Sequence, residues 1–312
     1  MTSALIGYTG FVGSNLDRQM RFTARYNSAN ISEIRGKTYD LVVCAGIRAE
    51  KWLANKSPER DWARIRDLLE NIKKVNAGRF IHVSTIDVYE NSGEGDENTP
   101  INPDHCQPYG RHRYRAEILL RELFKDLIIL RLPALFGPGL KKNFVFDLLN
   151  PVPRVIFPEK FWEILDKVGA ADKKLLKSCY RMDAQFNLIP GLHKEALSTL
   201  HKILDQVGFT SLNFTHHKSA FQYYPLRRLK SDLEIVLNHN IQLQNLVTEP
   251  LPSDELAREV FELEFLNITD KPPLQYNLKS IHHRLWNNQE GYVYSKAQIL
   301  DWLADFRANY RI

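Results

Sequence analysis

The stretch Gly7-Tyr8-Thr9-Gly10-Phe11-Val12-Gly13 follows the apolar run Ala4-Leu5-Ile6 and opens an apolar-periodic segment that reaches Met20. Its glycines recur at every third position between a strand-like and a helix-like segment, the context that a dinucleotide-binding turn requires. In such a turn Gly7 lets the chain leave the strand, Gly10 lets backbone approach a pyrophosphate, and Gly13 lets helix pack on strand. Free N–H groups at the helix start, at Phe11 and Val12, then face the phosphates. The stretch therefore predicts a cofactor-binding turn.

Short apolar runs alternate with helical patterns through the first half of the chain. The predicted strands are 4–7, 23–27, 41–44, 80–84 and 127–132, and the predicted helices are 12–20, 58–75 and 109–124. Strands separated by helices are joined by crossovers, which makes a sheet mostly parallel. We therefore expect an α/β fold with a doubly wound parallel sheet of the Rossmann type, whose ligands bind beyond the carboxyl ends of the strands.

The pattern changes after residue 140. Prolines become frequent between residues 138 and 158, and helical patterns follow at 160–167, 192–207, 253–265 and 295–306. We expect residues 1–140 to form the dinucleotide-binding domain. Residues 141–312 are expected to form a mixed region that returns strands to the sheet and adds a smaller C-terminal substrate lobe.

The composition of the 312 residues, with 44% apolar and 25% charged side chains, is that of an ordinary soluble protein. The net charge of +5 is mild and its basic residues are scattered, which argues against a nucleic-acid partner. No apolar stretch is long enough to cross a membrane, and we expect a cytoplasmic protein. The three cysteines, Cys44, Cys106 and Cys179, are far apart, which argues against a disulfide framework and against a metal site.

A second group of residues comprises Ser84-Thr85-Ile86-Asp87-Val88-Tyr89 and, further on, Tyr109-Gly110-Arg111-His112-Arg113. With the segments 97–103 and 130–139 and the sequence Pro108-Tyr109-Gly110, it resembles the extended short-chain dehydrogenase/reductase family. Within that family it is similar to nucleotide-sugar epimerases, dehydratases and reductases. The resemblance covers residues 3–140, and segments 245–250 and 291–294 are loose echoes of the same family.

Chemistry at a carbinol carbon requires a hydroxyl proton to move together with a hydride. A tyrosine can move that proton if a nearby cation brings its pKa, ordinarily about 10, toward neutrality. The resemblance implies that Tyr109 is this acid–base residue and that Ser84 or Thr85 orients the substrate oxygen. It implies that Arg113, one helical turn after Tyr109, is the cation.

The residue at position 113 departs from the family pattern, which has lysine there. Arginine keeps the positive charge, but its forked donors would not hold a ribose in the same way. Two interpretations stay open: Arg113 is a working variant, or the site has lost its chemistry and kept its ligand.

The segment after the fourth predicted strand bears on the reaction. Dehydratases of the family typically have two acidic residues where this chain has Ile86 and Asp87. The missing first carboxylate disfavours dehydration and leaves keto reduction or epimerisation open. Asp87 is either a substrate contact or the cap of a turn at the strand end.

The choice of cofactor depends on a position about 20 residues after the first glycine, where NAD-binding turns carry an acidic residue. This chain has Asn27 and Ser28 there, which can donate to a 2′-phosphate, and Arg48 can add charge. These residues favour NADP over NAD. The resemblance also places Pro133 in the nicotinamide loop.

The function that the sequence predicts is NADP-linked reduction of a keto group on a nucleotide-activated sugar, with Arg227 or Arg228 on a substrate phosphate. One alternative is a nucleotide-sugar epimerase that retains NAD. Another is a non-catalytic NADP-binding sensor or scaffold of the same fold. The resemblance implies a homodimer formed through helices 58–75 and 109–124.

Overall fold

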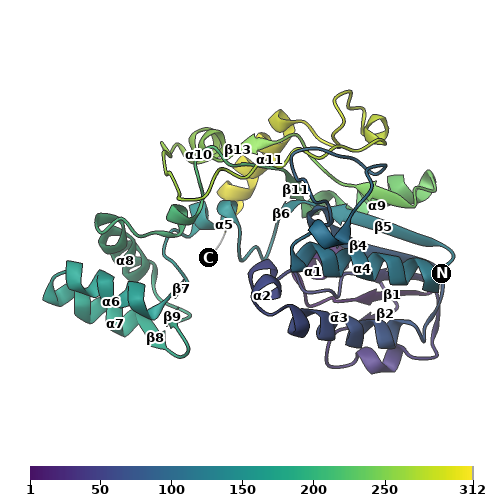
Figure 1. The fold of residues 1–312 in the computed structure, drawn as a ribbon, viewed down its shortest axis with the longest axis horizontal. Helices are drawn as coiled ribbons and strands as arrows, with labels where there is room; N and C mark the ends of the chain where they lie inside the picture. Colours follow the sequence, from purple (N-terminus) through teal and green to yellow (C-terminus); the bar gives the residue numbers. More distant parts are fainter. Residues whose placement is uncertain (311–312) are drawn as a thin grey trace. The chain divides into compact units, whose positions relative to one another are not determined.

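The structure is a computed structural model that describes residues 1–310. The chain divides into two compact units. Within the described residues, the main unit contains residues 1–140, 220–251 and 275–310, and the second unit contains residues 141–219 and 252–274. Each is described by itself below and can be followed by its labels in Figure 1.

The centre of the main unit is a six-stranded sheet in the order β12-β5-β4-β3-β1-β2. Its strands are β1 (Ser3–Ile6), β2 (Ala24–Tyr26), β3 (Thr38–Cys44), β4 (Asn76–Thr85), β5 (Leu127–Leu132) and β12 (Leu243–Asn245). All neighbouring strands run parallel. The predicted Rossmann-type parallel sheet is therefore confirmed. Strands β3 and β4 begin earlier than their apolar cores suggested, because polar residues at their starts still pair with the neighbouring strand.

The helices of the main unit are α1 (Phe11–Gln19), α2 (Lys51–Lys56), α3 (Pro58–Ile72), α4 (Pro108–Leu123), α9 (Leu229–Asn238) and α11 (Lys296–Asn309). Helices α3 and α4 both begin with proline, where a missing N–H costs nothing. The short helix α2 carries no clear periodicity and was not predicted. The remaining strands are β6 (Ala134–Phe136), β10 (Ala220–Phe221), β11 (Tyr223–Pro225) and β13 (Leu251–Pro252), the last ending where the second unit resumes.

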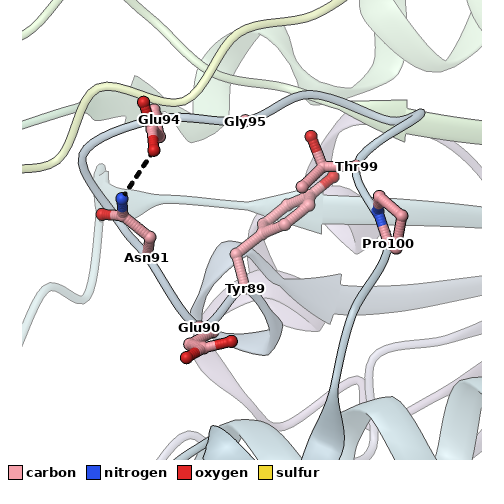
Figure 2. Close-up of a pocket in the computed structure, with 7 residues that line it drawn as sticks. All are labelled: Tyr89, Glu90, Asn91, Glu94, Gly95, Thr99 and Pro100. Atoms are coloured by element: carbon pink, nitrogen blue, oxygen red, sulfur yellow. Dashed lines mark hydrogen bonds between the residues drawn. The ribbon is translucent and has the colours of Figure 1, made fainter.

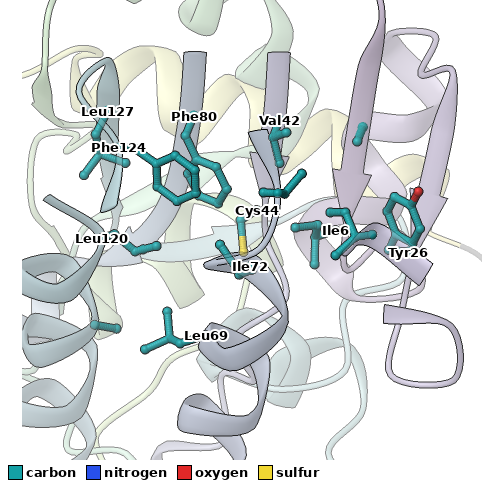
Figure 3. Close-up of a cluster of buried hydrophobic side chains, with 14 of the residues drawn as sticks. Ile6, Tyr26, Val42, Cys44, Leu69, Ile72, Phe80, Leu120, Phe124 and Leu127 are labelled. Atoms are coloured by element: carbon teal, nitrogen blue, oxygen red, sulfur yellow. The ribbon is translucent and has the colours of Figure 1, made fainter. Parts of the chain in front are cut away.

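A hydrophobic core lies between the sheet and helices α3 and α4, as Figure 3 shows. Ile6 and Phe80 contribute from the strands, and Leu69 and Leu120 from the helices. The rings of Phe80 and Phe124 stack with centroids 4.1 Å apart. Burial of this face fixes α3 and α4 on the sheet, so that the start of α4 lies close to the carboxyl end of β4.

The second unit is smaller and mostly helical. It contains α5 (Phe144–Leu149), β7 (Val155–Ile156), α6 (Pro158–Lys167), α7 (Ala170–Cys179), β8 (Tyr180–Met182), β9 (Phe186–Leu188), α8 (Lys194–Gln206) and α10 (Ser253–Phe261). The three strands form an antiparallel sheet in the order β7-β9-β8. Phe161 of α6 is fully buried and stacks on Phe186 of β9 with centroids 3.8 Å apart. Within residues 1–310, none of the helices has the length and apolarity needed to cross a membrane.

Candidate functional site

The glycine turn leaves strand β1 and enters helix α1. Gly7 has a φ of +87°, and a Cβ added to it would overlap the carbonyl group of Ala45. A Cβ on Gly13 would overlap the carbonyl of Gly7, whereas a Cβ on Gly10 would come no closer than 3.2 Å to the carbonyl oxygen of Gly7. Gly10 caps α1, whose first turn carries no acidic side chain. The turn therefore offers an open backbone surface and a helix N-terminus, which fit a pyrophosphate.

The residues predicted to choose the cofactor lie at the carboxyl ends of the strands. The Gly7 amide donates to the carbonyl of Tyr26 over 2.7 Å, so Asn27 follows directly beside the turn. Asn27 Nδ2 donates to the hydroxyl of Tyr8 over 3.2 Å. Ser28 is exposed. The structure thus brings Asn27 to the glycine turn.

Arg48 and Pro133 lie at the ends of two further strands. Arg48 follows β3, and its guanidinium is largely exposed, 3.9 Å from the carboxylate of Glu50. Pro133 follows β5 directly and is half-buried. Both therefore lie at the carboxyl edge of the sheet, and their role in cofactor binding stays a prediction.

Tyr109 is set by the start of helix α4. Its amide donates to Asn55 Oδ1 of helix α2 over 2.9 Å. A side chain on the next residue, Gly110, would overlap the carbonyl of Asp87. The order Pro-Tyr-Gly thus lets α4 begin in contact with the short 3-10 helix η2 (Ile86–Val88) that follows β4.

Thr85, the last residue of β4, lies close enough to the Tyr109 hydroxyl to lower its pKa. Ser84 points the other way, since successive residues of a strand face opposite sides. Its hydroxyl donates to Glu117 Oε1 over 2.5 Å and is buried. Of the two residues that the resemblance offered, the structure brings Thr85 to Tyr109 and binds Ser84 to α4 instead.

Arg113 is buried and fully engaged by neighbours. It makes a two-pronged ion pair with Asp61 of α3, Nη1 at 2.6 Å and Nη2 at 3.0 Å. Nη1 also donates to the Tyr109 carbonyl and Nη2 to the carbonyl of Arg48. The guanidinium carbon lies 3.9 Å from the centroid of the Tyr109 ring. Arg113 therefore packs on the ring of Tyr109, and its hydrogen bonds go to other groups than the Tyr109 hydroxyl.

The pKa of Tyr109 is raised to about 12. Burial is the main cause of the increase. Arg113, Lys51 and Thr85 lower the pKa of Tyr109, and Asp87 raises it. The expectation that Arg113 brings this pKa toward neutrality is not met here. The reason is that removal of the tyrosine from water outweighs the nearby positive charges.

Lys51, Asp87 and Tyr276 form a cluster of polar side chains, and only Asp87 among them was expected from the sequence. Lys51 Nζ lies 2.7 Å from Asp87 Oδ1 and donates to the Tyr276 hydroxyl over 3.0 Å. The Tyr276 hydroxyl in turn donates to the same Asp87 oxygen over 2.9 Å. Lys51 and Tyr276 are distant in sequence from any motif, so only the fold brings them together.

Arg227 and Arg228 do not join this group. They lie in the 3-10 helix η5 (Leu226–Arg228), where Arg227 pairs with Asp305 over 3.3 Å and Arg228 donates to the hydroxyl of Tyr294 over 3.0 Å. Within residues 1–310, their polar partners come from the C-terminal part of the main unit. Their role as phosphate ligands stays a prediction.

A pocket of about 360 Å³ lies beside η2, in the loop that follows it (Figure 2). Its lining residues all come from one loop: Tyr89, Glu90, Asn91, Glu94, Gly95, Thr99 and Pro100. The hydroxyl of Tyr89 accepts from Arg131, which forms a buried ion pair with Glu117 at 2.6 Å. The pocket is thus anchored to the buried Glu117–Arg131 pair and does not include Tyr109.

Within residues 1–310, no three His, Cys, Asp or Glu side chains are grouped so that they could hold a metal ion.

Comparison with known proteins supports the family that the motifs indicate. Residues 23–154 match the model of the NAD dependent epimerase/dehydratase family. The family resemblance is confirmed. The match includes Thr85, Tyr109 and Arg113, and the glycine turn lies just before it. Among curated proteins, none matches this sequence.

Solved structures share the fold over nearly the whole chain. dTDP-4-dehydrorhamnose reductase from Yersinia enterocolitica is 12% identical, with a TM-score of 0.61 and 99% of each chain covered. RMD from Pseudomonas aeruginosa, complexed with NADPH, is 15% identical, with a TM-score of 0.61 and coverage of 98% of this chain and 99% of that one. UDP-N-acetylglucosamine 4-epimerase from Methanobrevibacter ruminantium M1 is 12% identical, with a TM-score of 0.58 and coverage of 98% and 97%. At these identities the likeness establishes the fold alone.

Proposed function

We propose that this protein is an NAD(P)-dependent oxidoreductase that reduces a keto group on a nucleotide-activated sugar. The observation that carries the proposal is that Thr85, the last residue of β4, and Tyr109, at the start of α4, lie at the carboxyl edge of the sheet that also carries the glycine turn. The family match supports it. The structural neighbours named above include a dehydrorhamnose reductase and a nucleotide-sugar epimerase, which support a substrate of this class.

Each group of residues would have its own role in the reaction. The backbone of the glycine turn and the start of α1 would hold the cofactor pyrophosphate, and the bound cofactor would supply the hydride. Thr85 would hold the substrate oxygen, and Tyr109 would donate its proton to that oxygen. A tyrosine whose pKa is raised to about 12 is protonated at neutral pH, which suits an acid.

NADP is our proposed cofactor. Asn27 reaches the glycine turn through its hydrogen bond to Tyr8, and the position offers an amide where NAD-binding turns place a carboxylate. Neighbouring folds have been solved with NADPH, with NADP and with NAD. We further propose a cytoplasmic homodimer that associates through α3 and α4, which light scattering would test.

A non-catalytic NADP-binding protein is the second candidate, and the state of Arg113 favours it. All four hydrogens of its two Nη atoms have acceptors within the protein, so neither Nη atom has a hydrogen to offer to a ribose. On this alternative the fold keeps the ligand and performs no reaction.

Two measurements separate the candidates. Titration of the purified protein with NADPH and with NADH, followed by cofactor fluorescence, tests binding. Consumption of NADPH with a panel of keto-sugar nucleotides then tests turnover. Tyr109→Phe should keep the binding and lose turnover at least about 100-fold, because general acid catalysis typically contributes that much. Binding without turnover in the unmodified protein would support the sensor, and failure to bind either cofactor would refute both.

A further inference from the structure

Lys51, Asp87 and Tyr276 close a triangle of hydrogen bonds in the main unit. Lys51 Nζ donates to Asp87 Oδ1 over 2.7 Å and to the Tyr276 hydroxyl over 3.0 Å. That hydroxyl donates to the same Asp87 oxygen over 2.9 Å. Each member is held by the other two, so the polar groups of the triangle that remain free have defined positions.

One donor and one acceptor of this triangle have no partner among residues 1–310. Lys51 Nζ carries three N–H bonds and uses two of them. Asp87 Oδ2 accepts no hydrogen bond in the described part of the chain, because both bonds to this carboxylate end on Oδ1. The side chains of Lys51 and Asp87 are 46% and 21% exposed, so the free groups are open to solvent or to a ligand.

The triangle adjoins the residues that are proposed to act on the substrate carbonyl. The amide of Asp87 donates to Thr85 Oγ1 over 3.2 Å. The carbonyl of Asp87 lies directly against Gly110, the residue after Tyr109, where an added Cβ would overlap it. A group that binds to the free atoms of the triangle therefore belongs to the part of the substrate that surrounds the reacting carbon.

Tyr276 and Asp87 are positioned by the same buried cluster. The ring of Tyr276 stacks on Phe221 with centroids 5.8 Å apart. It also packs against the hydrophobic cluster that includes Ile86 and Val88, the two residues that flank Asp87 in η2. Because the carboxylate and the tyrosine are already ordered by this packing, a ligand would not have to order them on binding.

The charges of the triangle restrict the kind of ligand that it can hold. Lys51 and Asp87 form an ion pair, so the triangle has no net charge to attract a phosphate, and the free carboxylate oxygen would repel one. A free N–H beside a free acceptor instead matches two neighbouring hydroxyl groups. One hydroxyl can accept from Lys51, and the other can donate to Asp87. Sugars carry such pairs of hydroxyl groups.

We propose that Lys51 and Asp87, positioned by Tyr276, bind two adjacent hydroxyl groups of the sugar that is reduced. The proposal deepens the proposed function and rests on it, since it assigns the triangle to the sugar part of a nucleotide-activated substrate. The triangle then selects sugars that carry both hydroxyl groups. A deoxy sugar that lacks one of them would leave a charged group of the protein without its hydrogen bond.

The experiment is calorimetric titration of the full-length protein with UDP-glucose, dTDP-glucose and GDP-mannose, each compared with its own nucleoside diphosphate. The ratio of the two Kd values isolates the contribution of the sugar. In the unmodified protein, at least one nucleotide sugar should bind more tightly than its diphosphate. Lys51→Met and Asp87→Ala should each weaken that nucleotide sugar about 10- to 100-fold, the range for hydrogen bonds to charged groups, and leave the diphosphate unchanged.

Two further variants serve as controls. Lys56→Met is the matched control, because Lys56 lies on the same helix and contacts the ring of Trp52, and it should leave both Kd values unchanged. Lys51→Arg keeps a charged donor and should recover most of the affinity for the nucleotide sugar. A merely structural role of the triangle would weaken the nucleotide sugar and the diphosphate alike, which would refute the proposal.

The outcomes separate this proposal from the proposed function. If Lys51→Met binds a nucleotide sugar as well as Lys56→Met does, or if no nucleotide sugar binds better than its diphosphate, the sugar assignment is refuted. Oxidation of NADPH by keto-sugar nucleotides then decides the reductase independently. If the sugar contribution is lost in both variants of the triangle but no keto sugar is reduced, the assignment is supported and the reductase is refuted. Circular dichroism checks that each variant is folded, and Asp87→Asn replaces Asp87→Ala if that variant is not.

Discussion

His82 offers a sharp test of the packing between β4 and α4. The side chain is fully buried on β4, and neither ring nitrogen has a hydrogen-bond partner within residues 1–310. Burial lowers its pKa from 6.5 to about 4, and the nearby Glu117 only partly compensates. His82 therefore binds a proton more readily in the unfolded chain than in the folded chain. The free energy of unfolding falls for this reason as the pH decreases from about 6.5 toward 4.

The size of the effect follows from these two pKa values. Linkage gives a loss of about 2 kcal/mol between pH 7 and pH 5, close to one and a half pKa units. His82→Leu has a similar volume and no buried nitrogen. We expect it to be more stable than the unmodified protein by about 1–3 kcal/mol at pH 7, because an unsatisfied polar group is removed. Its advantage should grow by about 2 kcal/mol at pH 5.

The assay is urea denaturation of both proteins at pH 7 and pH 5, with the exposed His239→Leu as control. The control should track the unmodified protein at both pH values. An advantage of His82→Leu that is the same at pH 7 and pH 5 would refute the reasoning, because it would mean that His82 does not resist protonation in the folded state.

Three further predictions concern the site. Gly13→Ala should abolish NADPH binding in a fluorescence titration, because its Cβ would overlap the turn, whereas Gly169→Ala, which meets no atom closer than 4.0 Å, should bind normally. Asp61→Asn should destabilise the protein by about 3–5 kcal/mol in chemical unfolding, since it leaves Arg113 buried without its carboxylate; a change below about 1 kcal/mol would show that the pair is not needed. Asn27→Asp should weaken NADPH about tenfold relative to NADH, because a carboxylate repels a 2′-phosphate; unchanged relative affinities would show that Asn27 does not face that group.

The sequence by itself determined the parallel sheet and the elements around its ligand edge. The glycine turn, the apolar runs of the strands and the Pro-Tyr-Gly start of α4 are local signals, because each is required by the backbone at that place. Gly7 and Gly13 are needed where a Cβ would overlap a carbonyl, and Gly110 is needed where α4 meets η2. Such requirements can be recognised from spacing alone.

Only the tertiary structure decided which side chains meet at Tyr109. The sequence does not distinguish the hydroxyl side chains of Ser84 and Thr85. In the structure, successive side chains of β4 face opposite sides, so Thr85 lies near Tyr109 and Ser84 binds Glu117. The charge of Arg113 could be read from the sequence, but its neutralisation by Asp61 could not, because the two lie 52 residues apart. Lys51 and Tyr276 are 225 residues apart and meet because the chain returns to the main unit after residue 274. Burial, which raises the pKa of Tyr109, is likewise a property of the packed fold and of no single segment.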